Sequence, residues 1–342
     1  MTHQLVTSNS LNVQQIGRGA AWAASFARPE PLDLPRLPRV GVISNLRSHR
    51  NRAERRRMLD LPEAFVIRQA PDSRPALDHA MRDFAQQDIE LIVIDGGDGT
   101  VREVVSSAHA AFGARMPRFA ILRAGKTNAL AMDLGVPKDW TLEEVIAAHL
   151  DDRVVQRGPI RISWAHGKRP DLFGFIFGFG AYSRATMLAQ KVHRRGWFNS
   201  LAVFITLSWA LLRTMLGGAH TPWTRGDAVR ISRDDHDIVR ERLYLLLGST
   251  LHDLPVGLRP FGRPREGLKF LAIKAPPRRL WHFLPSILSG RRSDWLEAHG
   301  IFRRDADYLT VSVRKSFILD GERYPGGNLT ISQAAPIAFV VP

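Results

Sequence analysis

A glycine-rich loop between an apolar strand and a helix is the feature that most limits how this chain can fold. Residues Ile89 to Ile94 form a nearly continuous apolar run of strand length, and Gly96-Gly97-Asp98-Gly99-Thr100 follows almost directly. From about Val101 to Ala111 the sequence predicts a helix. A strand, a glycine turn and a helix in this order are typical of an open α/β sheet, and such sheets bind phosphate groups at this turn.

The residue types in the loop fit a phosphate site. Glycines let main-chain amides approach phosphate oxygens, and the positive end of the following helix faces the same charge. Asp98 would repel a phosphate, so we expect it to hold Mg²⁺ or its water ligands, and Thr100 can add a hydroxyl. The alternative is a plain glycine turn in which Thr100 caps the helix.

A second motif resembles the end of a P-loop but lacks its beginning. The first glycine of a P-loop would lie five positions before Gly125, where the chain has Ala120. Ile121 and Leu122, which lie between, indicate a strand. We therefore reject a P-loop, although Lys126 can still touch a phosphate as a point charge.

The pattern along the chain predicts two domains after a leader. Residues 1–38 resemble a leader that ends in a proline-rich stretch from Pro29 to Pro38, and we assign it no chemistry. Residues 39–155 alternate strands and helices, which predicts a parallel sheet with helices on both faces. Residues 156–342 contain short β-rich segments, which predict a largely antiparallel β domain. An apolar helical insertion near 197–216 is shorter than a comfortable membrane span, so we expect a buried or interfacial helix.

The segments expected in each domain are as follows. The strands of the first domain are 39–45, 65–69, 89–94 and 118–122, and its helices are 51–60, 76–87, 101–111 and 128–133. The strands of the second domain are 158–164, 172–179, 228–232, 242–248, 268–274 and 308–313.

Composition excludes some classes of function. The chain has no cysteine, which excludes disulfides and thiolate metal sites. Its 48 Lys and Arg against 33 Asp and Glu give a net charge of +15, which favours anionic partners such as phosphates, nucleic acid or an acidic membrane surface. A solvated basic surface is the alternative. No secretory signal is convincing, so we expect the protein to stay inside the cell.

Several motifs, in matching order over about residues 39 to 330, together resemble the diacylglycerol kinase catalytic family, which includes sphingosine and ceramide kinases and bacterial lipid kinases. The strongest is Gly96 to Thr100 followed by Glu103-Val104, which is similar to the family signature Gly-Gly-Asp-Gly-Thr-x-Asn-Glu-Val. Four shorter segments also match. Asn45-Leu46-Arg47-Ser48 is similar to the family motif Asn-Pro-x-Ser-Gly, and the segment 125–131 is similar to Gly-Thr-x-Asn-x-x-Ala. Asp320-Gly321-Glu322 is similar to Asp-Gly-Glu, and the segment 265–268 is similar to Asp-Asp-Gly-Leu.

The resemblance implies a fold and a site. The fold would be an N-terminal α/β domain like that of NAD kinase and phosphofructokinase, with a C-terminal antiparallel β-sandwich and ATP with Mg²⁺ in the crevice between them. The nucleotide would contact Asn45, Arg47, Ser48, Gly96, Gly97, Asp98, Gly99, Thr100, Glu103, Lys126 and Asn128. Asp98 and Glu266 would hold metal, and Asp320 or Glu322 would be the catalytic base. Asp320-Gly321-Glu322 can equally be a hairpin turn, and the two interpretations are compatible.

The chain departs from the family pattern at several positions. The family's proline, asparagine and threonine are here Leu46, Arg102 and Lys126, and the closing glycine of the first motif is His49. An aspartate of the β domain is here Gly180, and Arg265 replaces a carboxylate of the second metal site. These changes leave the fold expectation intact, but they leave the acceptor and the metal arrangement open.

The function expected from the resemblance is an ATP-dependent lipid kinase. It would phosphorylate the primary hydroxyl of ceramide or diacylglycerol, giving ceramide 1-phosphate or phosphatidic acid. We expect a cytoplasmic enzyme that binds the anionic inner face of the membrane peripherally, through the apolar segments Trp197 to Leu216 and Trp281 to Leu288 with their neighbouring arginines. These segments can instead be core helices. No nucleic acid partner is expected, and a homodimer is compatible with the pattern.

Two other functions remain open at this point. One is a kinase of a soluble substrate, such as an NAD kinase, which shares the Gly-Gly-Asp-Gly loop. The other is a basic protein that binds nucleotide or nucleic acid without catalysis, which Gly180 and Arg265 suggest.

Overall fold

A computed structural model of the chain describes residues 37–45, 65–125, 127–165, 167, 169–194, 224–234, 239–291 and 294–342. Contacts group Pro38–Pro342 into one unit, distinct from Met1–Leu37. The helix expected at 51–60, the apolar segment 197–216 and residues 1–36 of the expected leader lie outside the described residues.

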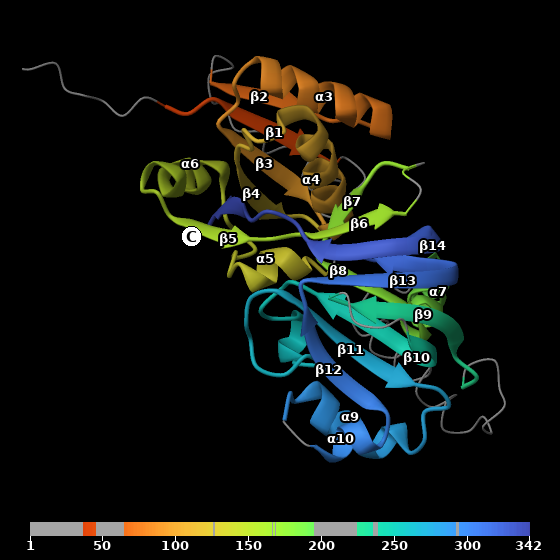
Figure 1. Ribbon diagram of the computed structural model, residues 1–342. Helices are drawn as coiled ribbons and strands as arrows, with labels where there is room; N and C mark the ends of the chain where they lie inside the picture. Colours follow the sequence, from red (N-terminus) through yellow and green to blue (C-terminus); the bar gives the residue numbers. More distant parts are fainter. Residues whose placement is uncertain are drawn as a thin grey trace, which may run out of the picture. The chain divides into compact units, whose positions relative to one another are not determined.

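The first sheet has six strands in the order β2-β1-β3-β4-β15-β5 (Figure 1). They are β2 (Val66–Gln69), β1 (Val40–Ser44), β3 (Leu91–Gly96), β4 (Arg118–Arg123), β15 (Ile337–Val340) and β5 (Val154–Arg157). All neighbours run parallel except β15 and β5, which are antiparallel. The helices of this part are α3 (Arg74–Gln86), α4 (Asp98–Phe112), α5 (Ala129–Asp133) and α6 (Leu142–Leu150).

Burial explains why these segments form these elements. The residues Leu91 to Ile94 are fully buried, as expected for a central parallel strand covered on both faces. Helix α3 buries its apolar residues at helical spacing, and Phe84 packs so closely on β1 that a Cβ at Gly41 would lie 2.5 Å from its ring. The sequence analysis did not predict helix α6, although Thr141 and Glu144 form a complete capping box at its start.

The second sheet is antiparallel throughout and has nine strands. They are β6 (Ile160–Trp164), β7 (Leu172–Gly174), β8 (Ile176–Gly180), β9 (Asp227–Arg233), β10 (Val239–Ser249), β11 (Leu268–Lys274), β12 (Ile301–Ala306), β13 (Tyr308–Leu319) and β14 (Glu322–Gln333). Their order is β12-β11-β10-β8-β13-β14-β6-β7, and β9 also pairs with both β10 and β13. Helix α7 (Ala181–Arg194) follows β8, and α9 (Leu280–Leu288) and α10 (Trp295–Ala298) lie between β11 and β12.

The predicted division into an α/β part and a later antiparallel β part is confirmed. The strands of the second part are hydrogen-bonded into one sheet. Its first strand in this order, β12, and its second-last, β6, share one hydrophobic core. The sheet therefore curves around that core. The C-terminal strand β15 returns to the first sheet beside β4, so the two sheets are joined at both ends of the second one.

No helix among the described residues is long and apolar enough to cross a membrane.

Candidate active site

The candidate site lies where the first sheet changes direction. After β1 the chain builds β2 on one side, and it then crosses to build β3 on the other side of β1. In open α/β sheets such a switch point leaves a crevice beyond the carboxyl ends of the two central strands. Asn45 follows β1 here, and its side-chain amide donates a hydrogen bond of 2.9 Å to the hydroxyl of Thr100 beyond β3. The structure therefore brings two predicted site residues together.

The glycines of the loop after β3 have different roles. A Cβ at Gly96 would lie 2.6 Å from the Thr100 side chain, and one at Gly97 would lie 2.9 Å from the Cα of Gly125. Gly99 has no atom within 4 Å of its Cβ position, so open space lies in front of it. Gly97, and not Thr100, precedes the first residue of α4 as its N-cap. The alternative of a Thr-capped turn is therefore wrong.

The loop after β4 packs directly against the first loop. A Cβ at Gly125 would lie 2.5 Å from the Cα of Gly97, so both positions need glycine. Asn128 adopts a left-handed conformation with φ of 51°. Its amide donates to the Gly125 carbonyl at 2.8 Å, and its carbonyl oxygen accepts from the Gly125 amide at 3.0 Å. Asn128 is buried and shapes this loop. Lys126 lies outside the described residues, as do Arg47 and Ser48.

Asp98, the predicted metal ligand, is the first residue of α4 and faces the start of α5. Burial raises the pKa of Asp98, while hydrogen bonds from the main-chain amides of Ala129, Leu130 and Asn128 act in the opposite direction. A carboxylate at the N-terminus of a helix is stabilised by the amides and by the helix dipole. Asp98 thereby ties the two glycine loops together, in addition to any role in binding.

Asp320 lies at a tight turn between the two longest paired strands. The turn Asp320-Gly321 joins β13 to β14 with φ angles of 46° and 80°, as in a two-residue type I′ hairpin. The carboxylate of Asp320 accepts hydrogen bonds from the main-chain amides of Phe175, at 3.0 and 3.1 Å, and of Ile176, at 2.8 Å. The segment is a hairpin turn, and Asp320 is half-buried while Glu322 is exposed.

The charges around Asp320 change its acidity. Burial, together with the neighbouring Asp98 carboxylate, raises the pKa of Asp320 from 3.8 to about 7. The amide of Ile176, the Arg102 guanidinium and the amide of Phe175 oppose this rise. A carboxyl with a pKa near 7 can exchange a proton at neutral pH, which is the property required of a general base. The environments of Asp320 and Glu322 therefore differ, although their roles stay predictions.

Tyr182 is a residue of this site that the sequence analysis missed. Burial raises the pKa of Tyr182, and the charges of Asp320 and Asp98 raise it further. Its ring also covers Gly178, where a Cβ would lie 2.6 Å from a ring carbon. The only local signal was its position directly after Gly178-Phe179-Gly180-Ala181, the altered form of a family motif.

Arg102, which replaces the asparagine of the family signature, is buried between the two sheets. Its side chain is 3 % exposed and donates hydrogen bonds to the Leu319 carbonyl at 3.4 Å and to the Glu103 carboxylate at 3.0 Å. The guanidinium also lies 5.6 Å from the centre of the Tyr324 ring. Arg102 thus anchors α4 to the β13–β14 hairpin that carries Asp320. Glu103, predicted to contact nucleotide, is engaged by Arg102.

Gly180 cannot be replaced by the aspartate of the family motif without rearrangement. Its φ angle is 73°, and a Cβ at this position would lie 2.4 Å from the main-chain oxygen of Tyr244. The departure from the family pattern is therefore built into the backbone at this position.

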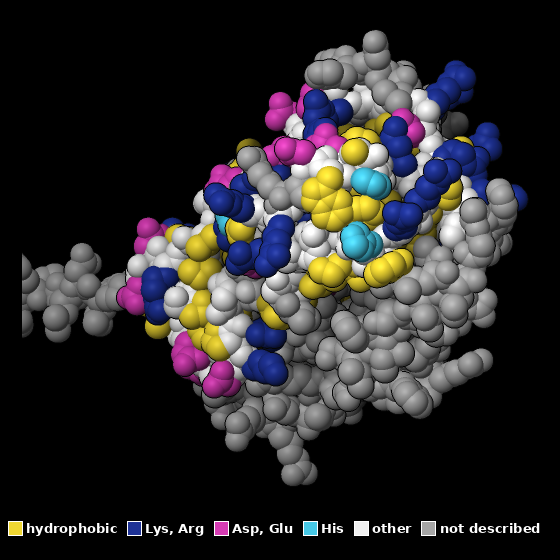
Figure 2. Space-filling view, turned by 90° about the horizontal axis from the view of Figure 1, so that it is seen from below, with side chains coloured by type: hydrophobic (Ala, Val, Ile, Leu, Met, Phe, Trp, Pro, Cys, Tyr) yellow, Lys and Arg dark blue, Asp and Glu magenta, His cyan; other side chains and the backbone are white. Residues whose placement is uncertain are grey.

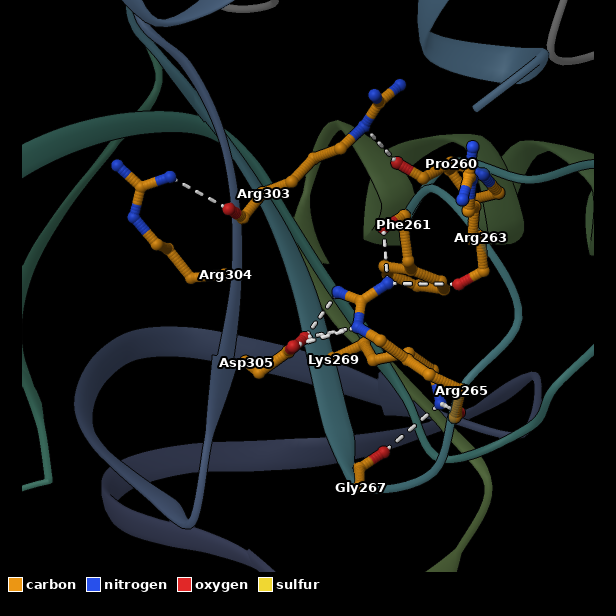
Figure 3. A network of polar contacts seen from close by, with 9 residues as sticks. All are labelled: Pro260, Phe261, Arg263, Arg265, Gly267, Lys269, Arg303, Arg304 and Asp305. Carbon is orange, nitrogen blue, oxygen red and sulfur yellow. Dashed lines mark hydrogen bonds and ion pairs between the residues drawn. The ribbon is translucent and has the colours of Figure 1, made fainter. Parts of the chain in front are cut away.

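The segment from Arg265 to Lys269 forms a polar network of its own (Figure 3). Arg265 donates to the Asp305 carboxylate at 2.8 Å through Nε. The buried ammonium of Lys269 donates to the carbonyls of Arg265 at 2.6 Å and Gly267 at 3.1 Å, and burial, followed by the charge of Arg265, lowers its pKa from 10.5 to about 8. Glu266 is exposed. Within the described ranges no three His, Asp or Glu residues are grouped to hold a metal ion, so the pairing of Asp98 with Glu266 stays a prediction.

The arrangement fits a phosphate-bearing nucleotide with Mg²⁺. Two glycine loops meet at the switch point, and open space lies before Gly99. The Asp98 carboxylate lies close enough to Asp320 to raise its pKa, and carboxylate oxygens are ligands that Mg²⁺ prefers. Bound Mg²⁺ would supply positive charge to the phosphate oxygens.

Comparisons with known proteins agree with this geometry. Residues 40–157 match the diacylglycerol kinase catalytic domain, so the resemblance is confirmed over this segment and supports a function of the lipid kinase type. Three solved structures from Bacillus anthracis are similar over 90% of this chain and 98% of theirs, with 16% identity and TM-scores of 0.60, 0.63 and 0.62. One is described as a diacylglycerol kinase, and two carry that description provisionally. This likeness shows a shared fold. No curated protein matches the chain significantly.

Proposed function

We propose that the protein is an ATP-dependent lipid kinase that transfers the γ-phosphate to the primary hydroxyl of a membrane lipid, diacylglycerol or ceramide. The products would be phosphatidic acid or ceramide 1-phosphate. The observation that carries the proposal is the position of Asp320. It is a carboxyl with a pKa of about 7, held by the hairpin turn and electrostatically coupled to Asp98 of the glycine loop.

Each residue has a defined part in this proposal. The main-chain amides around Gly97 and Gly99 bind phosphate oxygens, and the Asn45 to Thr100 hydrogen bond keeps the two strand ends in register. Asp98 holds the metal that accompanies ATP. Asp320 accepts the proton of the lipid hydroxyl while the hydroxyl oxygen attacks the γ-phosphorus of ATP, and ADP leaves on the opposite side.

The surroundings of Asp320 suit a base that must ionise near neutral pH. The two main-chain amides that bind its carboxylate hold it in one orientation, and its raised pKa increases its basicity. Arg102 opposes the rise and so keeps a share of the carboxyl groups ionised at pH 7. Glu322 is exposed to solvent, whereas Asp320 is held by main-chain amides, which favours Asp320 as the base.

A lipid acceptor also determines where the protein would act. We propose a cytoplasmic enzyme that associates peripherally with the inner face of the membrane, where its acceptor is found. The net charge of +15 suits an anionic surface.

A lipid-class screen tests the proposal. Purified protein is incubated with ATP, Mg²⁺ and separate micelles of diacylglycerol, ceramide, sphingosine or a bulk lipid extract, and products are identified by mass; NAD serves as the soluble acceptor. We expect a phosphorylated lipid with the wild type and at least about a hundredfold less with Asp98→Ala. Phosphorylation of NAD without lipid, or activity unchanged in Asp98→Ala, would reject the proposal.

A further inference from the structure

Helices α9 and α10 form an exposed aromatic surface on the outer face of the second sheet. On α9, Leu280, Phe283 and Ile287 pack into a hydrophobic core with residues of β10, β11 and β12, whereas Trp281 is 55 % exposed. On α10, Leu296 is buried and Trp295 is 41 % exposed. The two helices are therefore core elements on one side and present large apolar rings to solvent on the other.

The exposed rings form one continuous group, which we call the aromatic platform: Trp281, His282, Trp295 and His299. The ring of His282 lies 5.5 Å from that of Trp281 and 6.2 Å from that of Trp295, and Trp295 lies 6.3 Å from His299. Phe283 supports the platform from below, 4.7 Å from both Trp295 and His299. Figure 2, which views the molecule from below Figure 1, shows hydrophobic and histidine side chains gathered on this face, with Lys and Arg beside them.

The charge around the platform is mainly positive. Arg278 and Arg279 come just before α9 and Arg291 comes shortly after it, and all three are exposed. None of the three forms an ion pair with another residue of the described ranges. The nearby Glu297 is already bound by Arg304 through two hydrogen bonds of 2.5 and 2.8 Å, so the other acidic side chain here is Asp294, the N-cap of α10.

The platform is held in place by Arg303. Its guanidinium donates to the carbonyls of Ser286 and Ile287 at 2.9 Å and of Arg291 at 2.7 Å, at the C-terminal end of α9. Its Nε donates to the Pro260 carbonyl at 2.8 Å, as Figure 3 shows. These bonds satisfy carbonyls that a helix end leaves unpaired. Trp281 is thus presented by an anchored helix.

We propose that the aromatic platform docks on an anionic lipid bilayer, with the rings of Trp281 and Trp295 in the interface and Arg278, Arg279 and Arg291 on lipid phosphates. Tryptophan rings prefer the boundary between headgroups and acyl chains. Basic side chains beside such rings add attraction to anionic lipids. The exposed carboxylates in the described part of these helices are Asp294 and Glu297, and Glu297 is paired with Arg304. The proposal rests on the proposed function only in that a lipid acceptor gives the enzyme a reason to bind a bilayer.

Vesicle flotation tests the proposal. Full-length protein is mixed at physiological salt with vesicles of phosphatidylcholine alone, or with about a third phosphatidylglycerol. We expect binding to the anionic vesicles, a loss on the order of a hundredfold in the triple variant Arg278→Gln, Arg279→Gln, Arg291→Gln, and a loss of about tenfold or more in Trp281→Ala. Trp281 is chosen because its exposed ring can be removed without opening the core.

A second triple variant is the matched control: Arg82→Gln, Arg115→Gln and Arg314→Gln remove the same charge from exposed positions elsewhere. Equal losses in both triple variants would mean attraction by net charge alone and would overturn the platform proposal. Wild-type binding by Trp281→Ala would also overturn it. A third result would also overturn the platform proposal: the wild type binds no vesicles but self-associates, and the platform variants abolish the self-association. The face would then be a protein interface.

The kinase proposal is judged separately, with short-chain diacylglycerol in detergent micelles, where docking is not required. Platform variants that lose vesicle binding but keep micellar activity support both proposals. Vesicle binding by a wild type that phosphorylates no lipid would leave the platform proposal standing and reject the kinase proposal.

Discussion

Asp320→Asn should inactivate the enzyme and, at alkaline pH, make the fold more stable. The carboxyl of Asp320 has a pKa of about 7 in the folded chain against an ordinary value of 3.8. Because the folded chain holds the proton more tightly than the unfolded chain does, the free energy of unfolding falls as the pH rises from about 4 to about 7. Asparagine tolerates the left-handed backbone at this position and keeps one oxygen to accept the two amides.

The size of the effect follows from the pKa difference. A tenfold change in proton binding corresponds to about 1.4 kcal/mol, so full ionisation of Asp320 costs about 4 kcal/mol above pH 7. Part of this cost is already present at pH 5, where an unfolded carboxyl is ionised. Between pH 5 and pH 8 the wild type should therefore lose roughly 2–3 kcal/mol more than Asp320→Asn.

Urea unfolding at pH 5 and pH 8, with EDTA and without nucleotide, measures this difference. The Glu322→Gln variant, which alters an exposed carboxylate at the same turn, should show the pH dependence of the wild type and keep activity. In the kinase assay, Asp320→Asn should lose about 10²- to 10⁴-fold, and wild-type activity should rise through about pH 7. Equal pH dependence of stability in wild type and Asp320→Asn would refute the burial argument. An active Asp320→Asn with an inactive Glu322→Gln would make Glu322 the base.

Four other substitutions test separate parts of the site. Gly99→Ala should fold as the wild type and gain up to about 1 kcal/mol of helix stability. Calorimetry should nevertheless show weaker ATP binding by this variant, because the added Cβ enters the open space before the loop. Gly125→Ala should lose about 1–3 kcal/mol of stability because its Cβ meets the backbone of Gly97. Gly180→Asp, which introduces the family residue, should lower the thermal midpoint through a cost above about 2 kcal/mol and should not increase the activity. Arg102→Asn should cost about 1–3 kcal/mol and move the rise of the pH–rate profile to higher pH, because Arg102 lowers the pKa of Asp320; an unshifted profile would contradict this.

The parts of the site that the sequence could predict depend on local chain geometry. A strand, a glycine loop and a helix at Gly96 to Thr100 need only neighbouring residues, and parallel strand ends meet at one edge of a sheet. The Asp320-Gly321 hairpin is equally local, since both residues tolerate positive φ. These signals predicted the α/β fold correctly.

The parts that could not be predicted depend on packing between distant segments. The burial of Arg102 requires the hairpin, which lies more than two hundred residues away in the sequence, as the contact with Leu319 shows. Tyr182 belongs to the site because α7 places it near the carboxylates of Asp98 and Asp320. Strand β15 pairs with β4 of the first sheet, although it follows the last strand of the second sheet in the sequence. Asn128, whose contact with the nucleotide stays a prediction, also uses both side-chain groups to hold its own loop, which the sequence did not predict.

Transfer of labelled γ-phosphate from ATP to a bulk lipid extract, compared between wild type and Asp320→Asn, tests the central claim most directly. The account predicts label in an organic-phase product with the wild type and about a hundredfold less or lower with Asp320→Asn, both proteins being folded and binding ATP. A folded wild type that binds ATP but puts no label into any lipid would contradict it.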